Sequence, residues 1–143
     1  MKAHTERKRA TVSAWQAAWD EGKVDVLDNL LAPSYRRHSN SSEAVQDREQ
    51  FKASITSTRQ AFPDLVTTID DMVEEGDQLA IRWHSNGTHT GTMFGVPPTR
   101  RSVSVYGVTF AHFSGDQVVE EWVTWDPRQL LTALGVITLG GGS

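Results

Sequence analysis

The spacing of the apolar residues changes once along the chain, close to Pro63. Upstream, Val12, Trp15, Ala18 and Trp19 recur at intervals of three and four residues, which is the period of one helical face. Downstream, apolar and polar residues alternate in segments separated by glycine-containing turns, which is typical of strands joined in hairpins. Helices followed by consecutive hairpins predict an α+β fold with a mostly antiparallel sheet.

Four helices are expected, three of them before the sheet. They span residues 5–20, 24–31, 47–62 and 128–134. Gly22, Pro33 and Pro63 end the first three helices, and Pro127 opens the short C-terminal one. The polar stretch 38–43 is predicted to be a loop between the second helix and the third.

Four strands are expected after the change of period, arranged as two hairpins. They span residues 65–73, 78–89, 102–113 and 117–125. Between the hairpins, residues 90–101 hold two glycines and two prolines around Met93, Phe94 and Val96. This composition predicts a loop with an apolar tip, and such tips often cover pockets.

Length and charge limit the class of protein. With 143 residues the chain has the usual size of one domain, and residues 1–139 are expected to fold as one unit. Residues 140–143 have the Gly/Ser composition of a flexible linker or cloning scar. The net charge of -4 comes from interspersed acids and bases, so a nucleic-acid partner is disfavoured.

Other features of the composition concern the compartment. The chain has no cysteine, which excludes disulfides and thiolate chemistry. It contains no run of 18 apolar residues, so no membrane span is expected. The first residues are basic but lack the apolar run of a secretory signal, so we expect a cytoplasmic protein.

A set of strings keeps its order and spacing from residue 62 to residue 135. They are FPDL (62–65), IDDMVEEGD (69–77), RW (82–83), GTHTG (87–91), GVPPT (95–99), EEW (120–122) and the leucines and glycine of 130–135. Upstream, Trp19, the string LLA (30–32) and Tyr35 followed by His38 match more loosely. Together these strings resemble the SnoaL-like polyketide cyclases, or ester cyclases, of the nuclear transport factor 2-like superfamily.

The resemblance implies a cone-shaped α+β barrel with a pocket between the curved sheet and the helices. It also implies a homodimer, a small apolar or aromatic polyketide-like substrate, and ring-closing chemistry that needs no cofactor. The implied fold agrees with the fold predicted from periodicity.

Asp126 is the first candidate for catalysis, because it ends the last predicted strand immediately before Pro127. Alternation places it on one face with Trp122 and Thr124. An acid beside an apolar surface has a raised pKa, which suits proton transfer near neutral pH. By resemblance, Asp126 matches the general acid/base of the family. The alternative is a helix N-cap, since Asp before Pro is a common start signal.

His112 is the second candidate, near the end of the preceding strand. By resemblance it matches a pocket position that is histidine in the ring-closing cyclases and commonly arginine in other relatives. An imidazole there could hydrogen-bond a substrate carbonyl or orient Asp126. The alternative is a histidine at the sheet edge that faces water.

The remaining candidates concern substrate binding. By resemblance, His38 matches a histidine that faces the pocket. Bulky apolar residues are also expected to line it, although the core is the alternative for most of them: Trp15, Trp19, Phe94, Phe110 and Trp122. On the second strand, Arg82 and His84 share one face while Trp83 and His89 share the other, so only one set can face the pocket. No triad of metal ligands is visible, so no metal is expected.

Two departures from the family bear on function. Relatives often place glycine after the string PPT, where this chain has Arg100 and Arg101, so the loop and its substrate need not be the same. The superfamily's epoxide hydrolases are disfavoured because their Arg-x-Asp is absent around Trp83, and its steroid isomerases because Trp15 replaces a tyrosine. A cyclase, a polyketide hydroxylase and a non-catalytic binding module therefore remain as hypotheses.

Overall fold

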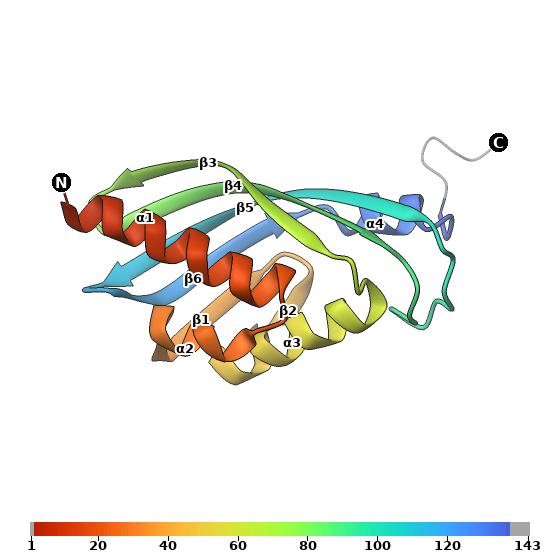
Figure 1. Cartoon of the computed structure of the whole chain (residues 1–143), viewed down its shortest axis with the longest axis horizontal. Coiled ribbons are helices and arrows are strands. Elements are labelled where there is room, and N and C mark those ends of the chain that lie inside the picture. The colour runs from red at the N-terminus through yellow and green to blue at the C-terminus, as the bar shows by residue number, and fades with distance from the viewer. Residues whose placement is uncertain (1, 138–143) are drawn as a thin grey trace.

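The structure, a computed structural model, describes residues 2–137. The linker-like tail predicted at 140–143 lies outside the described residues. Within them, helices cover one side of a single curved sheet (Figure 1). This arrangement confirms the predicted α+β fold with a curved, mostly antiparallel sheet.

The sheet has six strands in the order β2-β1-β6-β5-β4-β3. They are β1 (Leu31–Ser39), β2 (Ser42–Gln46), β3 (Val66–Glu75), β4 (Gln78–Thr88), β5 (Ser102–Ser114) and β6 (Gln117–Trp125). Neighbouring strands pair antiparallel except β1 and β6, which are parallel. The two predicted hairpins, β3–β4 and β5–β6, are both present. Gly76 and Gly115 turn them with positive φ angles of 57° and 61°, which glycine adopts without strain.

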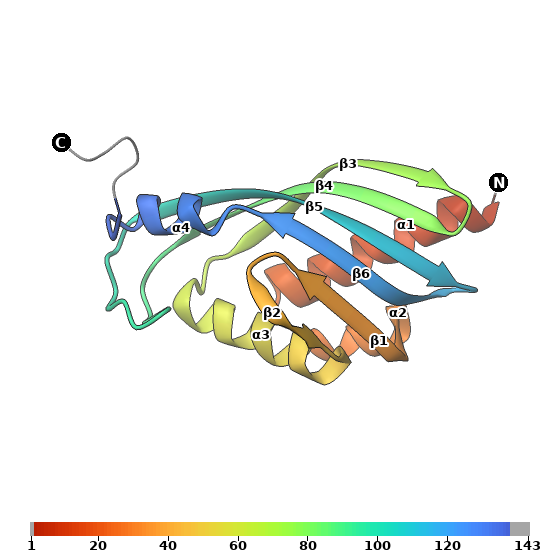
Figure 2. The ribbon, with the colours of Figure 1, turned by 180° about the vertical axis from the view of Figure 1, so that it is seen from behind.

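The helices lie on the concave side of the sheet and at one end of it (Figures 1 and 2). They are α1 (Lys2–Trp15), the π-helical turn η1 (Gln16–Asp20), the 3-10 turn η2 (Val24–Val26), α2 (Leu27–Leu30), α3 (Arg48–Ala61) and α4 (Pro127–Ala133). The buried face of the first helix runs through Thr11, Ala14, Trp15 and Ala18, while the predicted Val12 is 40% exposed. The apolar face is therefore rotated slightly from the predicted one.

Helix α3 begins where the sequence predicts. The Asp47 side chain accepts a hydrogen bond from the backbone N–H of Gln50 at 2.8 Å, and the Gln50 side chain accepts one from the Asp47 backbone N–H at 2.9 Å. This reciprocal pair is a capping box, which satisfies amides that the first helical turn cannot. Phe51, Ile55 and Ala61 are buried, as predicted, so α3 presents a fixed face to the sheet.

The predicted loop at 38–43 is wrong, because β1 and β2 occupy most of it. Strand β1 has few apolar residues after Ala32, so its alternation is carried mainly by polar side chains. Its parallel pairing with β6, far along the chain, decides its conformation, and local patterns do not report such pairing. Pro33 falls where the β1–β6 register is irregular, which accommodates its missing N–H.

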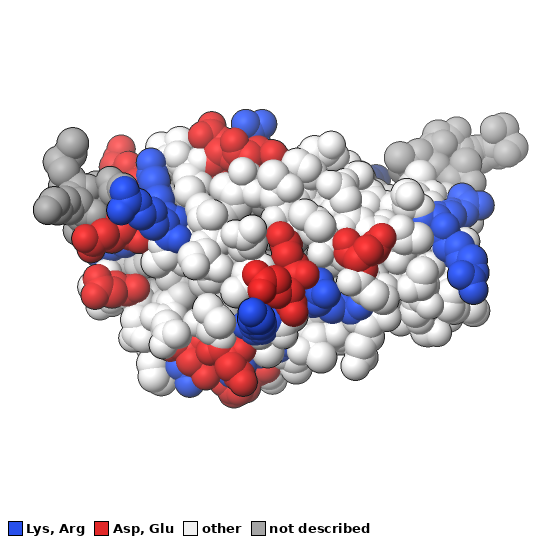
Figure 3. Space-filling model, in the orientation of Figure 1, with Lys and Arg blue, Asp and Glu red and all other residues white. Residues whose placement is uncertain are grey.

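Figure 3 shows acidic and basic side chains mostly close to one another on the face that carries α1 and α3. A continuous basic surface is therefore not seen on this face of the described chain. No helix between residues 2 and 137 is long and apolar enough to cross a bilayer.

Candidate functional site

A cavity of about 370 Å³ lies between the helices and the concave face of the sheet. This volume suits a small organic molecule. Its walls come from α1, η1, α3, α4, the inner side chains of all six strands or their turns, and the loop after β4. The cavity is therefore the natural candidate for a binding site.

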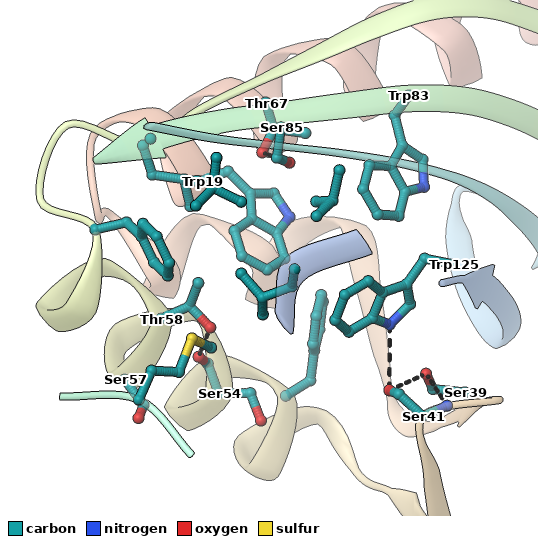
Figure 4. A pocket seen from close by; sticks show the side chains of 18 of the residues that line it. Trp19, Ser39, Ser41, Ser54, Ser57, Thr58, Thr67, Trp83, Ser85 and Trp125 are labelled. Atoms are coloured by element: carbon teal, nitrogen blue, oxygen red, sulfur yellow. Dashed lines mark hydrogen bonds between the residues drawn. The ribbon is translucent and has the colours of Figure 1, made fainter. Parts of the chain in front are cut away.

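Aromatic rings form most of the apolar wall. The lining includes Trp15, Trp19, Trp83, Trp125, Phe51, Phe62 and Phe94. Figure 4 shows Trp19, Trp83 and Trp125 pointing into one space from η1, β4 and the end of β6. Flat ring faces on several sides favour a flat, conjugated ligand.

Two of these tryptophans are fixed by their surroundings. Trp83 lies across from Gly107, where a Cβ atom would approach the Trp83 ring to 2.3 Å, so only glycine fits. The Trp83 Nε1 donates to Thr109 Oγ1 at 3.0 Å. Trp125 Nε1 donates to Ser41 Oγ at 3.2 Å, and Asn40 exchanges hydrogen bonds with the Trp125 backbone at 2.7 and 3.0 Å. Both indoles are therefore held in place before any ligand binds.

Hydroxyl groups supply most of the polar wall, and many of them already have partners. Thr67 Oγ1 and Ser85 Oγ are 2.7 Å apart on β3 and β4. Ser54 Oγ accepts from Gln46 Nε2 at 2.7 Å. Thr58 Oγ1 donates to the Ser54 carbonyl at 2.9 Å. These neutral groups could orient a ligand that carries several oxygens.

Arg37 is the one charged residue among those that line the cavity within the described chain. Its Nη1 lies 3.5 Å from Oε1 of Glu121, which is buried and also accepts a short hydrogen bond from the Tyr35 hydroxyl. The Arg37 guanidinium lies 4.1 Å from the centre of the Phe51 ring, in cation-π contact. Burial raises the pKa of Glu121, although Arg37 and Tyr35 oppose this shift.

The loop after β4 closes one end of the cavity. Met93 and Val96 pair across a tight turn in which Phe94 and Gly95 both have positive φ angles, 52° and 73°. Phe94 lines the cavity while 63% exposed, as the predicted apolar tip implied. Arg100, which follows the string PPT, has a φ angle of 62°. This is the left-handed backbone conformation that glycine favours, although the residue here is arginine.

The predicted site residues divide between the two faces of the sheet. Trp15, Trp19 and Phe94 line the cavity. Phe110 and Trp122 lie on the opposite, convex face and are 46% and 39% exposed. The structure therefore brings only part of the predicted set to the cavity.

The two candidate histidines meet on the convex face. His38 belongs to β1 and stacks on Trp122 with ring centres 5.0 Å apart, and its Nε2 lies 2.5 Å from Glu120 Oε2. The centre of the His112 ring lies 4.7 Å from the centre of the same indole. Neither histidine lines the cavity, because the even-numbered side chains of β6 from Glu120 onward, and those of the part of β5 paired with them, point outward. The expected pocket-facing His38 is thus corrected to an outward-facing strand residue.

Asp126 caps α4. Its carboxylate accepts hydrogen bonds from the Arg128 backbone N–H at 3.0 Å and from Arg128 Nε at 3.3 Å. These hydrogen bonds, from the side chain first and the backbone second, hold the pKa of Asp126 below its ordinary value. The predicted upward shift of this pKa is wrong, because the carboxylate is exposed and accepts hydrogen bonds from Arg128. Asp126 lies with Tyr106 and Thr124 around a shallow outer depression.

Sequence reasoning missed the inner-face residues Arg37, Glu121, Trp83 and Trp125. The alternation along β6 could have identified Glu121 and Trp125, because these odd-numbered residues lie on the face of the strand opposite to Trp122. Choosing between the faces requires the register and curvature of the sheet, which the sequence pattern leaves open. Within residues 2–137, no group of three or more His, Asp or Glu side chains is arranged to hold a metal ion.

Comparison with known proteins adds the family. No curated protein matches the chain significantly. Among solved structures, AclR, a proposed hydroxylase from Streptomyces galilaeus, is 28% identical with a TM-score of 0.83, over 94% of this chain and 98% of AclR. A proposed SnoaL-like polyketide cyclase from Jannaschia sp. CCS1 is 26% identical with a TM-score of 0.82, over 94% of both chains.

A third similar structure is IdmH, a proposed polyketide cyclase from Streptomyces antibioticus. It is 28% identical with a TM-score of 0.78, over 91% of this chain and 99% of IdmH. The sequence profile of the SnoaL-like polyketide cyclase matches residues 9–134. Because this match covers most of the chain, the protein belongs to the SnoaL-like polyketide cyclase family.

Proposed function

We propose that this chain closes a ring in a conjugated polyketide ester by intramolecular aldol addition, without a cofactor. The observation that carries the proposal is the cavity of about 370 Å³ lined by four tryptophans. Family membership and the likeness to IdmH support the same reaction class.

The reaction needs one proton transfer in each direction. A base removes a proton next to a carbonyl, the resulting enolate carbon bonds to a second carbonyl carbon, and the new alkoxide takes up a proton. The product has the mass of the substrate. Walls that hold the two reacting carbons of the molecule close together favour this step by restricting the substrate to reactive conformations, and a conjugated substrate itself delocalises the enolate.

Two groups of residues are candidates for the proton transfer. Asp126 and His112 are the pair that the resemblance implies; neither lines the cavity, and their role stays a prediction. Glu121, with Tyr35 and Arg37, is the carboxyl group beside the cavity wall. A positioned acid/base contributes on the order of 10² to 10⁴-fold to the rate, so substitution can separate the two.

The test is incubation with an anthracycline-type polyketide ester, without added cofactor, followed by mass spectrometry. We expect a new product of unchanged mass. A loss of turnover of about 100-fold or more in folded Asp126→Asn would assign the proton transfer to Asp126. Turnover close to that of the wild type would assign it to the cavity side. Binding of the ester without any turnover would contradict the cyclase and leave a binding module.

The likeness to AclR makes hydroxylation the second candidate. Hydroxylation adds one oxygen atom and requires an oxidant. A product heavier by one oxygen, formed only when oxygen and a reductant are supplied, would replace the cyclase with the hydroxylase.

We also propose that two copies pair through the convex face of the sheet. Tyr106, Phe110 and Trp122 lie there with 39–56% of their surface exposed, which is typical of an interface. Light scattering after size exclusion should give a dimer for the wild type and a monomer for Phe110→Glu. Val45→Glu, which changes an equally exposed apolar residue of β2, is the control. A monomeric wild type would contradict the pairing.

A further inference from the structure

Arg37 differs from every other polar residue of the cavity wall. It projects inward from β1 beside Phe51, and its side chain is only 15% exposed. A nearly buried guanidinium cannot shed its charge by deprotonation, so it requires compensation from its surroundings. The nature of that compensation indicates what the cavity is built to receive.

The Arg37 donors are mostly uncommitted. A guanidinium carries five N–H groups, yet within 3.5 Å the described residues offer Arg37 one acceptor, Glu121 Oε1, at the limit of that distance. By contrast, Trp83, Trp125 and Thr67 are engaged with other groups of the wall at 2.7–3.2 Å. Arg37 therefore retains hydrogen-bonding capacity on the cavity side that the protein does not satisfy.

The guanidinium is nevertheless held in place. Arg37 and Glu121 are directly paired residues of β1 and β6, and Phe51 of α3 packs against the charged group at 4.1 Å. A donor that is fixed but unsatisfied is preorganised for a ligand, because binding costs little further ordering.

We propose that Arg37 binds an anionic oxygen of the ligand, either a carboxylate or the oxygen of an enolate or phenolate, attached to a conjugated ring system. This inference rests on the proposed function and names the ligand class for the same cavity. The ring system would lie among the tryptophans while the charged oxygen accepts paired N–H bonds from the guanidinium. The anchored oxygen would then fix which part of the ligand lies deepest.

The probes are 2-naphthoate and its neutral methyl ester, measured by isothermal titration calorimetry at pH 7.5. A hydrogen bond to a charged group changes affinity by roughly 10- to 150-fold, so the wild type should prefer naphthoate by at least about tenfold. Arg37→Gln should remove the preference. Arg37→Lys, which keeps the charge but loses the planar fork, should retain part of it.

The matched control is Arg36→Gln. Arg36 is the next residue along β1, is exposed and hydrogen-bonds the Tyr35 carbonyl, so its loss should leave the preference unchanged. The single variant Arg37→Gln leaves the Glu121 carboxylate buried without its cation. The double variant Arg37→Gln/Glu121→Gln removes this unpaired charge and therefore serves as a second test. It should also lack the preference.

Four results would overturn the inference. Equal binding of both probes to the wild type would reject the anchor but retain the aromatic cavity as a binding site. A preference that survives in the double variant, or one that Arg36→Gln abolishes, would assign the anion to another place. Binding of neither probe would contradict the cavity function and the anchor together.

Discussion

The concave and convex faces of β6 carry side chains with different surroundings. On the concave face, Glu121 contacts Tyr35 and Arg37, and Val123 is buried in the core. Trp125 lines the cavity. Outward, Trp122 contacts two histidines, and Asp126 just beyond the strand caps a helix. A single step along the chain thus separates a residue that can touch a cavity ligand from one that cannot.

The comparison also shows that polar residues serve different purposes on the two faces. On the concave face, hydroxyls and indoles pair with one another and leave Arg37 available. On the convex face, His38 and Glu120 pair with each other beside exposed aromatic rings. The arrangement on the concave face favours binding of a small ligand, and the arrangement on the convex face favours contact with another protein surface.

The largest expected effect is the loss of ligand binding when the concave face is filled. Ser85→Trp should lower the affinity for methyl 2-naphthoate by about tenfold to a hundredfold, since the indole would occupy cavity space that the ligand needs, and such a steric conflict costs roughly 1–3 kcal/mol. Figure 4 shows Ser85 pointing into the cavity. Asn86→Trp, the exposed neighbour on β4, is the control and should bind normally. Equal losses in both variants would contradict the division between the faces.

The next effect concerns stability. Val123 is 2% exposed and Val73 is 63% exposed, so the same substitution can be made on a buried and on an open site. Val123→Ala should lower the free energy of unfolding by about 2 kcal/mol, from lost burial and the cavity left behind. Val73→Ala should change it by less than about 0.5 kcal/mol. Urea denaturation measures both, and similar losses would show that the convex face is covered in solution.

Much of the fold was predictable from the sequence because its signals are local. The helical period of α3 with its Asp47 and Gln50 capping pair, and the turns at Gly76 and Gly115, each lie within one short segment. Strands β1 and β2 were missed because their pairing with distant partners, rather than their own residues, decides their conformation. Local patterns therefore predicted the elements but not the complete sheet.

The site was harder to predict than the fold. The alternation of β6 was read correctly, but the choice of its inner face was not available from the pattern, and so Asp126 was selected over Glu121. Trp15, Trp19 and Phe94 line the cavity. Their directions were easier to predict, because the buried face of a helix and the tip of a loop leave fewer possible directions for a side chain. His38 and His112 depended on the direction of strand side chains, which reverses with a shift of one residue.

The smallest expected effect compares one acid from each face through the pH dependence of stability. Burial raises the pKa of Glu121, whereas hydrogen bonds from Arg128 lower the pKa of Asp126. Because the pKa of Glu121 is higher in the folded protein than in the unfolded chain, the free energy of unfolding falls when this carboxyl group ionises. The stability of the wild type relative to Glu121→Gln should therefore fall as the pH rises from about 4.3, the ordinary glutamate value, towards the raised pKa.

Asp126 should give the opposite slope. Its lowered pKa contributes stability that is present above about 3.9, the ordinary aspartate value, and is lost as the pH falls through the lowered pKa. The stability of the wild type relative to Asp126→Asn should therefore shrink towards acid pH. Urea denaturation of the three proteins between pH 3 and 8 measures both slopes. Slopes of the same sign would mean that Glu121 and Asp126 occupy similar environments, and the distinction between the concave and convex faces would not extend to their acids.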